Sequence, residues 1–284
     1  LLAGGILTAL FIALQIMSNH VQMSYYFLFV ILFIVGAYFE DAWRNKTLPK
    51  FFKASAVVFV AALIGVAANL SNLYHTYTYS KETMRGKSEL VETGDAAKQT
   101  SSGLDRDYIT NWSYGIGETW TLLVPNFKGG SSSAPLSQSE TAMEKANPVY
   151  SSLYNSFPQY FGDQPWTAGP VYVGSFVLFL FVLGCFIVKG PLKWALLGAT
   201  FFSIVLAWGK NFMPLTDFFI DYIPMYNKFR AVSSILVIAE FTIPLLAIFA
   251  LKRVLDEPGI WKKYKKAFGI SLAQIGRASC RERV

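Results

Sequence analysis

The chain has 284 residues, of which 53% are hydrophobic and only 15% are charged. A soluble domain of this size usually has about 25% charged residues. Here the shortfall is concentrated in uncharged blocks about as long as a membrane span, and such blocks predict transmembrane helices. The composition therefore excludes an ordinary soluble enzyme and predicts an all-α, polytopic integral membrane protein.

Six apolar blocks follow one another along the chain, three before a long polar insert at residues 74–168 and three after it. They cover residues 1–17, 24–39, 54–73, 171–188, 192–208 and 232–251. The sequence therefore predicts about six transmembrane helices, with the insert between the third and the fourth.

Positive charge indicates the orientation of these helices. Residues 40–53, residues 189–193 and the tail after Leu251 are rich in Lys and Arg, and with six spans all three lie on one side. Because basic loops remain in the cytoplasm, we expect that side to be cytoplasmic, with residues 259–274 as a basic tail. The insert then faces the opposite, outer side of the membrane.

The insert has a mixed character. Residues 80–102 are polar with mixed charges, and residues 131–146 are rich in Ser, so both are typical of loops. Residues 111–127 between them contain Trp112, Trp120 and a Leu-Leu-Val run that ends at Pro125. That pattern predicts an amphipathic helix lying at the membrane surface, with its aromatic rings at headgroup level.

Both ends of the chain indicate a fragment of a longer protein. The chain begins at Leu1 inside an apolar block, and residues 275–284 resemble the in-frame translation of a sequencing adapter. Without this tail, three Arg and one Glu are removed, so the net charge falls from +7 to +5. Cys185 is then the one remaining thiol and cannot form an internal disulfide.

Three short polar clusters lie at the outer ends of the predicted spans. They contain His20 and Gln22, Lys81 and Arg85, and Lys228 and Arg230. The third places two cations on the outer side, against the charge rule. Outward cations beside a bilayer suit a lipid phosphate or a sugar phosphate, because Arg binds phosphate oxygens in a fork and Lys adds a point charge. The alternatives are that Lys228 and Arg230 only extend to lipid headgroups, and that His20 is structural.

Glu240 is an ionisable residue in the last apolar block, four residues before Pro244. Such a group is costly in a bilayer, so we expect it to face the bundle interior or a wet cavity. A proton relay, a substrate contact and an ion pair with a buried cation all fit. The two His residues lack paired ligand spacing, which predicts no metal site, and no nucleotide-binding or hydrolase motif indicates a cofactor.

Four stretches resemble the YfhO family of bacterial polytopic membrane proteins, particularly its Bacteroidetes members. They are NHVQMSYYFL, YSKETMRG, WSYGIGETWTLLVPNFKGG and YIPMYNKFRAVSSI. The resemblance covers most of residues 1–258 and implies a longer parent with further spans on both sides. The family is similar in architecture to GT-C glycosyltransferases, which use a lipid-phosphate-linked sugar on the outer face of the membrane.

One feature of the GT-C enzymes has no counterpart here. They usually carry a key acidic residue in the first outer loop. None of the acidic residues considered, which are Glu82, Glu118, Asp217 and Asp221, matches a catalytic motif of the family. The resemblance therefore assigns no catalytic base.

The leading hypothesis is a membrane glycosyltransferase-like protein of the cell envelope, with a polyprenyl-phosphate sugar as donor. Lys228 and Arg230 would hold the donor phosphate, and the other four cluster residues would line the same outer cavity. Membrane lipid and a lipid-linked sugar are the expected partners, and nucleic acid is not. The alternatives are a transporter or flippase for an envelope precursor, indicated by Glu240 and Pro244, and a structural scaffold whose insert binds partners.

Overall fold

The computed structural model describes residues 1–83, 85–86 and 103–281. These residues form helices and turns, and they contain no strand apart from isolated bridges. The chain divides into two compact units. Unit 1 comprises Leu1–Ile109, Lys189–Phe202 and Asp217–Arg230, and unit 2 comprises Thr110–Val188, Ser203–Thr216 and Ala231–Val284. The all-α fold is confirmed, whereas the predicted loop at residues 87–102 lies outside the described residues.

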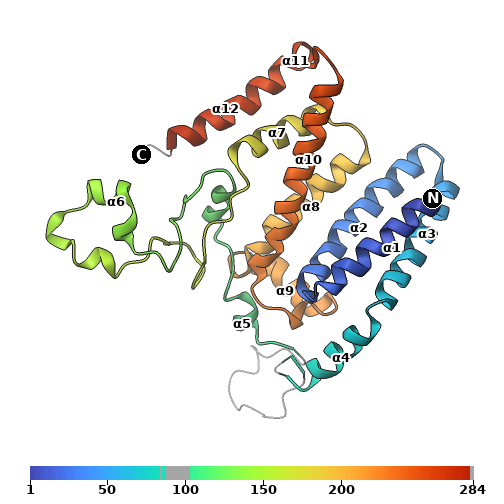
Figure 1. Ribbon diagram of the computed structural model, residues 1–284, viewed down its shortest axis with the longest axis horizontal. Helices are drawn as coiled ribbons and strands as arrows, with labels where there is room; N and C mark the ends of the chain where they lie inside the picture. The colour runs from blue at the N-terminus through green and yellow to red at the C-terminus, as the bar shows by residue number, and fades with distance from the viewer. Residues whose placement is uncertain (84, 87–102, 282–284) are drawn as a thin grey trace. The chain divides into compact units, whose positions relative to one another are not determined.

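Unit 1 begins with four helices in sequence. These are α1 (Leu2–Met17), α2 (Val21–Arg44), α3 (Leu48–Ala67) and α4 (Leu70–Lys81) (Figure 1). Helices α1 and α3 approach closely at Gly65, where a Cβ atom would lie 2.7 Å from the carbonyl oxygen of Ala9. Asn69 follows α3 and donates to the carbonyl of Ala13 at 3.0 Å. Small residues allow such close helix packing within a membrane.

Helices α2 and α3 are apolar but expose most of their surface. Only 11% of the apolar window of each is buried within the chain. An apolar surface of this extent is unfavourable in water, whereas a bilayer accommodates it. The turn between them follows from local sequence, because Lys46 is left-handed with φ of 56° and Pro49 lies in the first turn of α3.

An aromatic core joins α2 to the later segments of unit 1. These segments come from α8 (Pro191–Ala207), α9 (Met213–Tyr222) and the 3₁₀ helix η6 (Tyr226–Lys228). The ring of Phe29 lies 5.3 Å from that of Phe202 and 5.9 Å from that of Phe219, between centroids. Edge and tilted contacts of this kind stabilise aromatic clusters, and they fix the part of unit 1 that carries residues 225–230.

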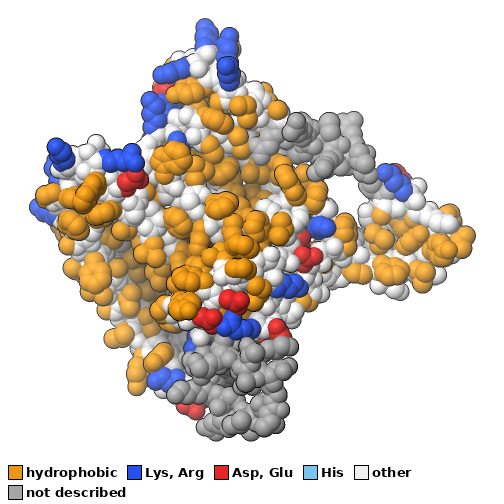
Figure 2. Space-filling view, turned by 180° about the vertical axis from the view of Figure 1, so that it is seen from behind, with side chains coloured by type: hydrophobic (Ala, Val, Ile, Leu, Met, Phe, Trp, Pro, Cys, Tyr) orange, Lys and Arg blue, Asp and Glu red, His pale blue; other side chains and the backbone are white. Residues whose placement is uncertain are grey.

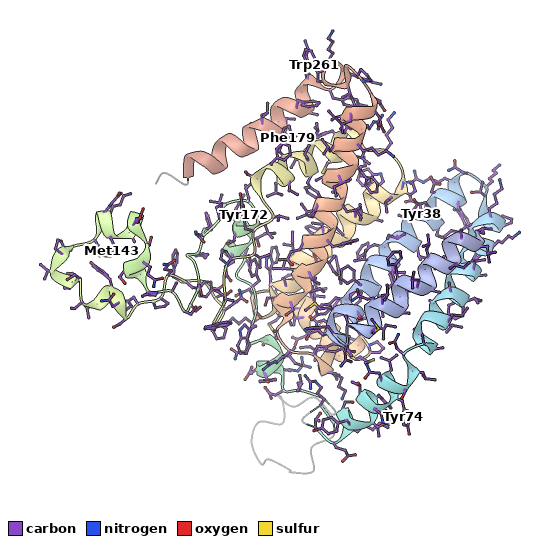
Figure 3. The ribbon with its side chains drawn as sticks, viewed as in Figure 1. Tyr38, Tyr74, Met143, Tyr172, Phe179 and Trp261 are labelled. Carbon is purple, nitrogen blue, oxygen red and sulfur yellow. The ribbon has the colours of Figure 1, made fainter. Side chains whose placement is uncertain are left out.

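Unit 2 is built on packed helices. These are α7 (Ser175–Ile187), α10 (Val237–Asp256), α11 (Ile260–Lys263) and α12 (Lys265–Arg281). A Cβ atom at Gly184 would lie 3.1 Å from Leu246, so α7 and α10 pack closely there. Phe179 of α7, labelled in Figure 3, contacts Phe268 of α12 with ring centroids 6.4 Å apart.

Short helices connect the longer ones. They are α5 (Arg106–Thr110), η1 (Gly117–Leu122), η2 (Leu136–Gln138), α6 (Glu140–Lys145), η3 (Pro148–Tyr150), η4 (Leu153–Asn155), η5 (Gly209–Phe212) and η7 (Val232–Leu236). Most of them lie in the segment that the sequence predicts as an insert.

Three helices among the described residues are long and apolar enough to cross a membrane. They are Val21–Arg44, Leu48–Ala67 and Val232–Asp256, and the pair Pro191–Ala207 and Gly209–Tyr222, bent by 106°, would be a fourth if it acts as one span. Helices α1 and α7 have 16 and 13 residues, shorter than the roughly 20 that a bilayer core requires. The structure thus supports a helical membrane protein, whereas the count of six spans and the orientation stay predictions.

Two expectations for the insert region are wrong in detail. The third apolar block does not end the helical region at residue 73, because α3 ends at Ala67 and α4 continues to Lys81. Residues 111–127 form only the six-residue 3₁₀ helix η1 rather than one amphipathic α-helix. Gly115, Gly117 and Pro125 disfavour an α-helix, and Leu122 and Val124 are buried inside unit 2.

Candidate functional site

Residues 225–230 of unit 1 form a constrained segment anchored by Phe229. The backbone of Phe229 is extended, with φ of −111° and ψ of 147°. The ring of Phe229 lies 5.1 Å from the ring of Tyr25 and 6.5 Å from that of Tyr26, between centroids. This extended residue links the 3₁₀ turn that carries Lys228 to Arg230, and its ring contacts hold this point of the segment against α2.

Arg85 and Lys228 exchange hydrogen bonds although they are far apart in sequence. Arg85 Nε donates to the carbonyl oxygen of Lys228 at 2.9 Å, and Lys228 Nζ donates to the carbonyl oxygen of Arg85 at 2.7 Å. Burial lowers the pKa of Lys228, since it disfavours the charged ammonium. Among the described residues, the terminal nitrogens of Arg85 have no hydrogen-bond partner.

Arg230 is held by Tyr108 and Gln22. Its Nη1 donates to the hydroxyl oxygen of Tyr108 at 2.8 Å, and Gln22 Nε2 donates to the carbonyl oxygen of Arg230 at 2.7 Å. Gln22 also donates to the hydroxyl of Tyr26 at 2.9 Å. Arg230 is an exposed residue, and these contacts hold its backbone and its side chain in place.

The structure brings together four of the six residues predicted from the sequence, namely Gln22, Arg85, Lys228 and Arg230. We call these four residues with Tyr108 the cation cluster. Lys81 ends α4 with its ammonium 4.4 Å from the ring centroid of Tyr77, and among the described residues it makes no hydrogen bond to the cluster. His20 is exposed immediately before α2 and likewise makes no side-chain bond to the cluster in the part of the chain described.

Two ion pairs of one arginine, which we call the Arg106 clamp, support the cation cluster through α5. Arg106, in the first turn of α5, binds the carboxylates of both Asp217 and Asp221 on α9, and the hydrogen bond and charge of Asp221, followed by Asp217, raise the pKa of Arg106. Residues four apart share one helix face, which is the signal in the sequence that identifies the two carboxylates. Because Tyr108 also lies on α5, the clamp positions the hydroxyl that holds Arg230.

The segment carries backbone strain at both ends. Met225 and Ala231 have φ of 67° and 59°, a left-handed conformation that costs a non-glycine residue about 1 kcal/mol or more. Surrounding contacts must hold such residues in place, and they concentrate at functional sites. The strain therefore supports residues 225–230 as a functional segment.

A second polar site lies within unit 2 around Glu118, which is 2% exposed. Its Oε2 accepts from the backbone N–H of Gly115 at 2.6 Å and of Asp163 at 3.4 Å. Its Oε1 accepts from the hydroxyl of Tyr160 at 2.5 Å. Burial, followed by the hydrogen bond to Glu118, raises the pKa of Tyr160. The phenol therefore remains a donor at neutral pH, and Glu118 ties the turn at residues 115–118 to residues 160–163.

A small pocket lies beside Glu118. It is lined by Tyr114, Glu118, Thr121, Lys128, Tyr160, Gln164, Thr167 and neighbouring residues. The pocket has room for about one water molecule. The hydroxyl of Tyr114 is buried and has no hydrogen-bond partner among the described residues, so one water there would satisfy it. We assign this site to the stability of unit 2.

Glu240 does not lie inside a packed bundle. It is exposed, in the first turn of α10, where the positive end of the helix dipole favours a carboxylate. Pro244 lies inside α10 without ending the helix. Within the described chain Glu240 is exposed and does not face a packed interior, so its place in a bundle interior or a wet cavity stays a prediction.

Comparisons with known proteins add no identification. No family model, no curated protein and no solved structure matches the chain. The functional argument therefore rests on the geometry of the cation cluster.

Proposed function

We propose that this chain belongs to an integral membrane protein that binds the phosphate of a lipid-linked sugar at the cation cluster. The observation that carries the proposal is the convergence of Arg85, Lys228 and Arg230 from distant parts of the sequence. Arg85 and Lys228 donate to carbonyl oxygens and Arg230 donates to a phenol oxygen, and these hydrogen bonds hold the three cations in place. A phosphate offers the anionic oxygens that such a group binds most strongly.

The proposed protein is a glycosyltransferase-like member of the YfhO family in a bacterial cytoplasmic membrane. In the proposed topology, six spans carry the chain, and the cation cluster and residues 74–168 face outward. The donor is a polyprenyl-phosphate sugar. During transfer the bond between the sugar's anomeric carbon and the phosphate oxygen breaks, the acceptor oxygen bonds to that carbon, and the acceptor proton is released. Fixed cations stabilise the charge that develops on the departing phosphate.

Replacing Arg230 with Ala tests this function in cells. We expect envelope sugar content in the producing bacterium to fall by roughly tenfold or more, because a charge-assisted bond contributes about 1.5–3 kcal/mol. The measurement is the sugar composition of the isolated envelope, with protein level checked by immunoblot. Arg44→Ala is the matched control, since among the described residues Arg44 pairs with its helical neighbour Glu40 in an exposed bond. Unchanged sugar content in Arg230→Ala at normal protein level would rule out the role.

A transporter or flippase for an envelope precursor is the second candidate. The observation that favours it is the 106° bend between Pro191–Ala207 and Gly209–Tyr222, because broken helices line many transport pathways. Both candidates place an anionic lipid at the cation cluster. They differ in the product, since a transporter would move the lipid-linked sugar across a vesicle membrane without breaking its glycosidic phosphate bond.

A further inference from the structure

Residues 131–158 of unit 2 form a small lobe that is closed at its neck. Leu136 N donates to the carbonyl of Phe157 at 2.8 Å, and Gln159 N donates to that of Ala134 at 2.9 Å. Ser132 adds a further link, because its Oγ accepts from the backbone N–H of Thr167 at 3.0 Å. The lobe therefore has a defined path and is held by hydrogen bonds at its base. We call it the 131–158 lobe; Met143 marks it in Figure 3.

The 131–158 lobe has no core of its own. None of its described side chains is buried. Several of them are large and apolar: Val149 is 79% exposed, and Tyr150, Leu153 and Phe157 are each about half exposed. Hydrophobic side chains cover much of this lobe in Figure 2, at its right. An apolar surface stabilises a fold only when it is removed from water, at about 25 cal/mol per Å². Such a cluster in a segment without a core indicates a surface that contacts an apolar environment.

Charge and apolar side chains are separated along the 131–158 lobe. Its charged residues, Glu140, Glu144 and Lys145, all lie on α6, whereas the exposed apolar residues follow at positions 149–157. This separation is the amphipathic arrangement of a segment that lies in a membrane interface.

The exposed aromatic residues continue beyond the 131–158 lobe toward a helix of membrane character. Phe161, Trp166 and Tyr172 are exposed, and Tyr172 directly precedes the apolar helix α7, as Figure 3 shows. Trp and Tyr gather at the headgroup level of membranes because their rings are apolar with one polar atom. The apolar surface of the lobe is thus continuous in sequence with the apolar helix α7 of the same unit.

We propose that positions 149–157 of the 131–158 lobe insert into the headgroup region of the bilayer that surrounds this chain. Unit 2 also contains Val232–Asp256, a helix long enough to cross that bilayer, so a lipid surface is always at high local concentration for a tethered lobe. A second protein would have to be recruited. The proposal adds this lobe to the membrane-surface contact predicted at residues 111–127, where Leu122 and Val124 are buried and Trp120 is 53% exposed. It does not depend on the proposed sugar transfer.

Site-directed spin labelling of the full chain in lipid nanodiscs tests the proposal. Val149→Cys, Leu153→Cys and Phe157→Cys are each labelled with a nitroxide after Cys185 and Cys280 have been replaced by Ser. The accessibilities to oxygen, which partitions into lipid, and to a nickel chelate, which stays in water, give a depth parameter. We expect a positive depth parameter at all three positions. Glu144→Cys on the charged helix α6 is the matched control, with a negative value expected.

Each other outcome overturns the proposal. A depth parameter at positions 149–157 equal to that at position 144 would place the lobe in water. Labels inaccessible to both reagents would show that protein covers the surface. Spin–spin broadening that disappears on dilution with unlabelled chain would identify that protein as a second copy. A variant that fails to incorporate into nanodiscs leaves the other two positions to decide.

Discussion

Replacing Lys228 and Arg230 together with Gln is expected to lower the affinity for polyprenyl phosphate by roughly 100-fold or more. Each cation would lose a charge-assisted bond to phosphate of about 1.5–3 kcal/mol, and 1.4 kcal/mol corresponds to tenfold in affinity. The anchor at Phe229 stays in place, so the segment keeps its path. Equilibrium binding of a fluorescent polyprenyl phosphate to the protein in nanodiscs measures the effect.

The pH dependence of this binding follows from Lys228. Burial lowers its pKa, so its ammonium is lost on raising the pH before that of an ordinary lysine, near pH 10.4. Binding should therefore weaken at alkaline pH in the wild type more than in the double variant. Lys262→Gln with Lys263→Gln removes the same charge from exposed positions in α11 and should bind normally. Equal losses in the two double variants would show general charge attraction rather than a site.

Replacing Glu118 with Ala is expected to destabilise unit 2 by about 3 kcal/mol. The change leaves the N–H of Gly115 and the hydroxyl of Tyr160 without an acceptor in a buried place, and each unsatisfied buried group costs about 1–3 kcal/mol. For a chain of this size, 1 kcal/mol corresponds to roughly 2–4 °C in Tm. Thermal unfolding in detergent, followed by tryptophan fluorescence, should show a fall of roughly 6 °C or more.

Two further variants separate the Glu118 contacts from the loss of a carboxylate as such. Tyr160→Phe removes one donor and should give a smaller fall in Tm than Glu118→Ala. Glu144→Ala removes an exposed carboxylate from α6 and should leave Tm within about 1 °C, as most surface changes do. If Glu118→Ala has the same Tm as Glu144→Ala, the hydrogen bonds at Glu118 do not stabilise this region.

Apolar blocks were the strongest signal in the sequence, and each of the six overlaps an α-helix. Their ends were less predictable, because hydropathy does not report where backbone hydrogen bonding stops. The helix break at Ala68 and the continuation of α4 to Lys81 are examples. At residues 111–127 the aromatic pattern was taken for a membrane-facing stripe. There Leu122 and Val124 are buried within unit 2 while Trp120 is exposed, and periodicity alone cannot distinguish the two environments.

The candidate site was predictable by residue type and not by pairing. The sequence identified Arg85, Lys228 and Arg230 because they are cations on the side opposite to the expected cytoplasmic one. The reciprocal bonds between Arg85 and Lys228 join positions 143 residues apart, and nothing in the local sequence specifies such a contact. Tyr108 and Arg106 were missed because their role exists only where α5 meets α9 within unit 1. Glu240 lies within the candidate span Val232–Asp256, as the apolar block predicted, but it is exposed in the described chain.

Photocrosslinking with a diazirine-bearing polyprenyl phosphate tests the proposed site most directly. The full chain in nanodiscs is irradiated with the probe, with and without excess unlabelled lipid phosphate, and the modified peptides are identified by mass spectrometry. The cation cluster predicts competable labelling in the peptides that contain Arg85 and residues 225–230. Competable labelling confined to the other basic segments, at residues 40–53 or 252–266, would contradict the site.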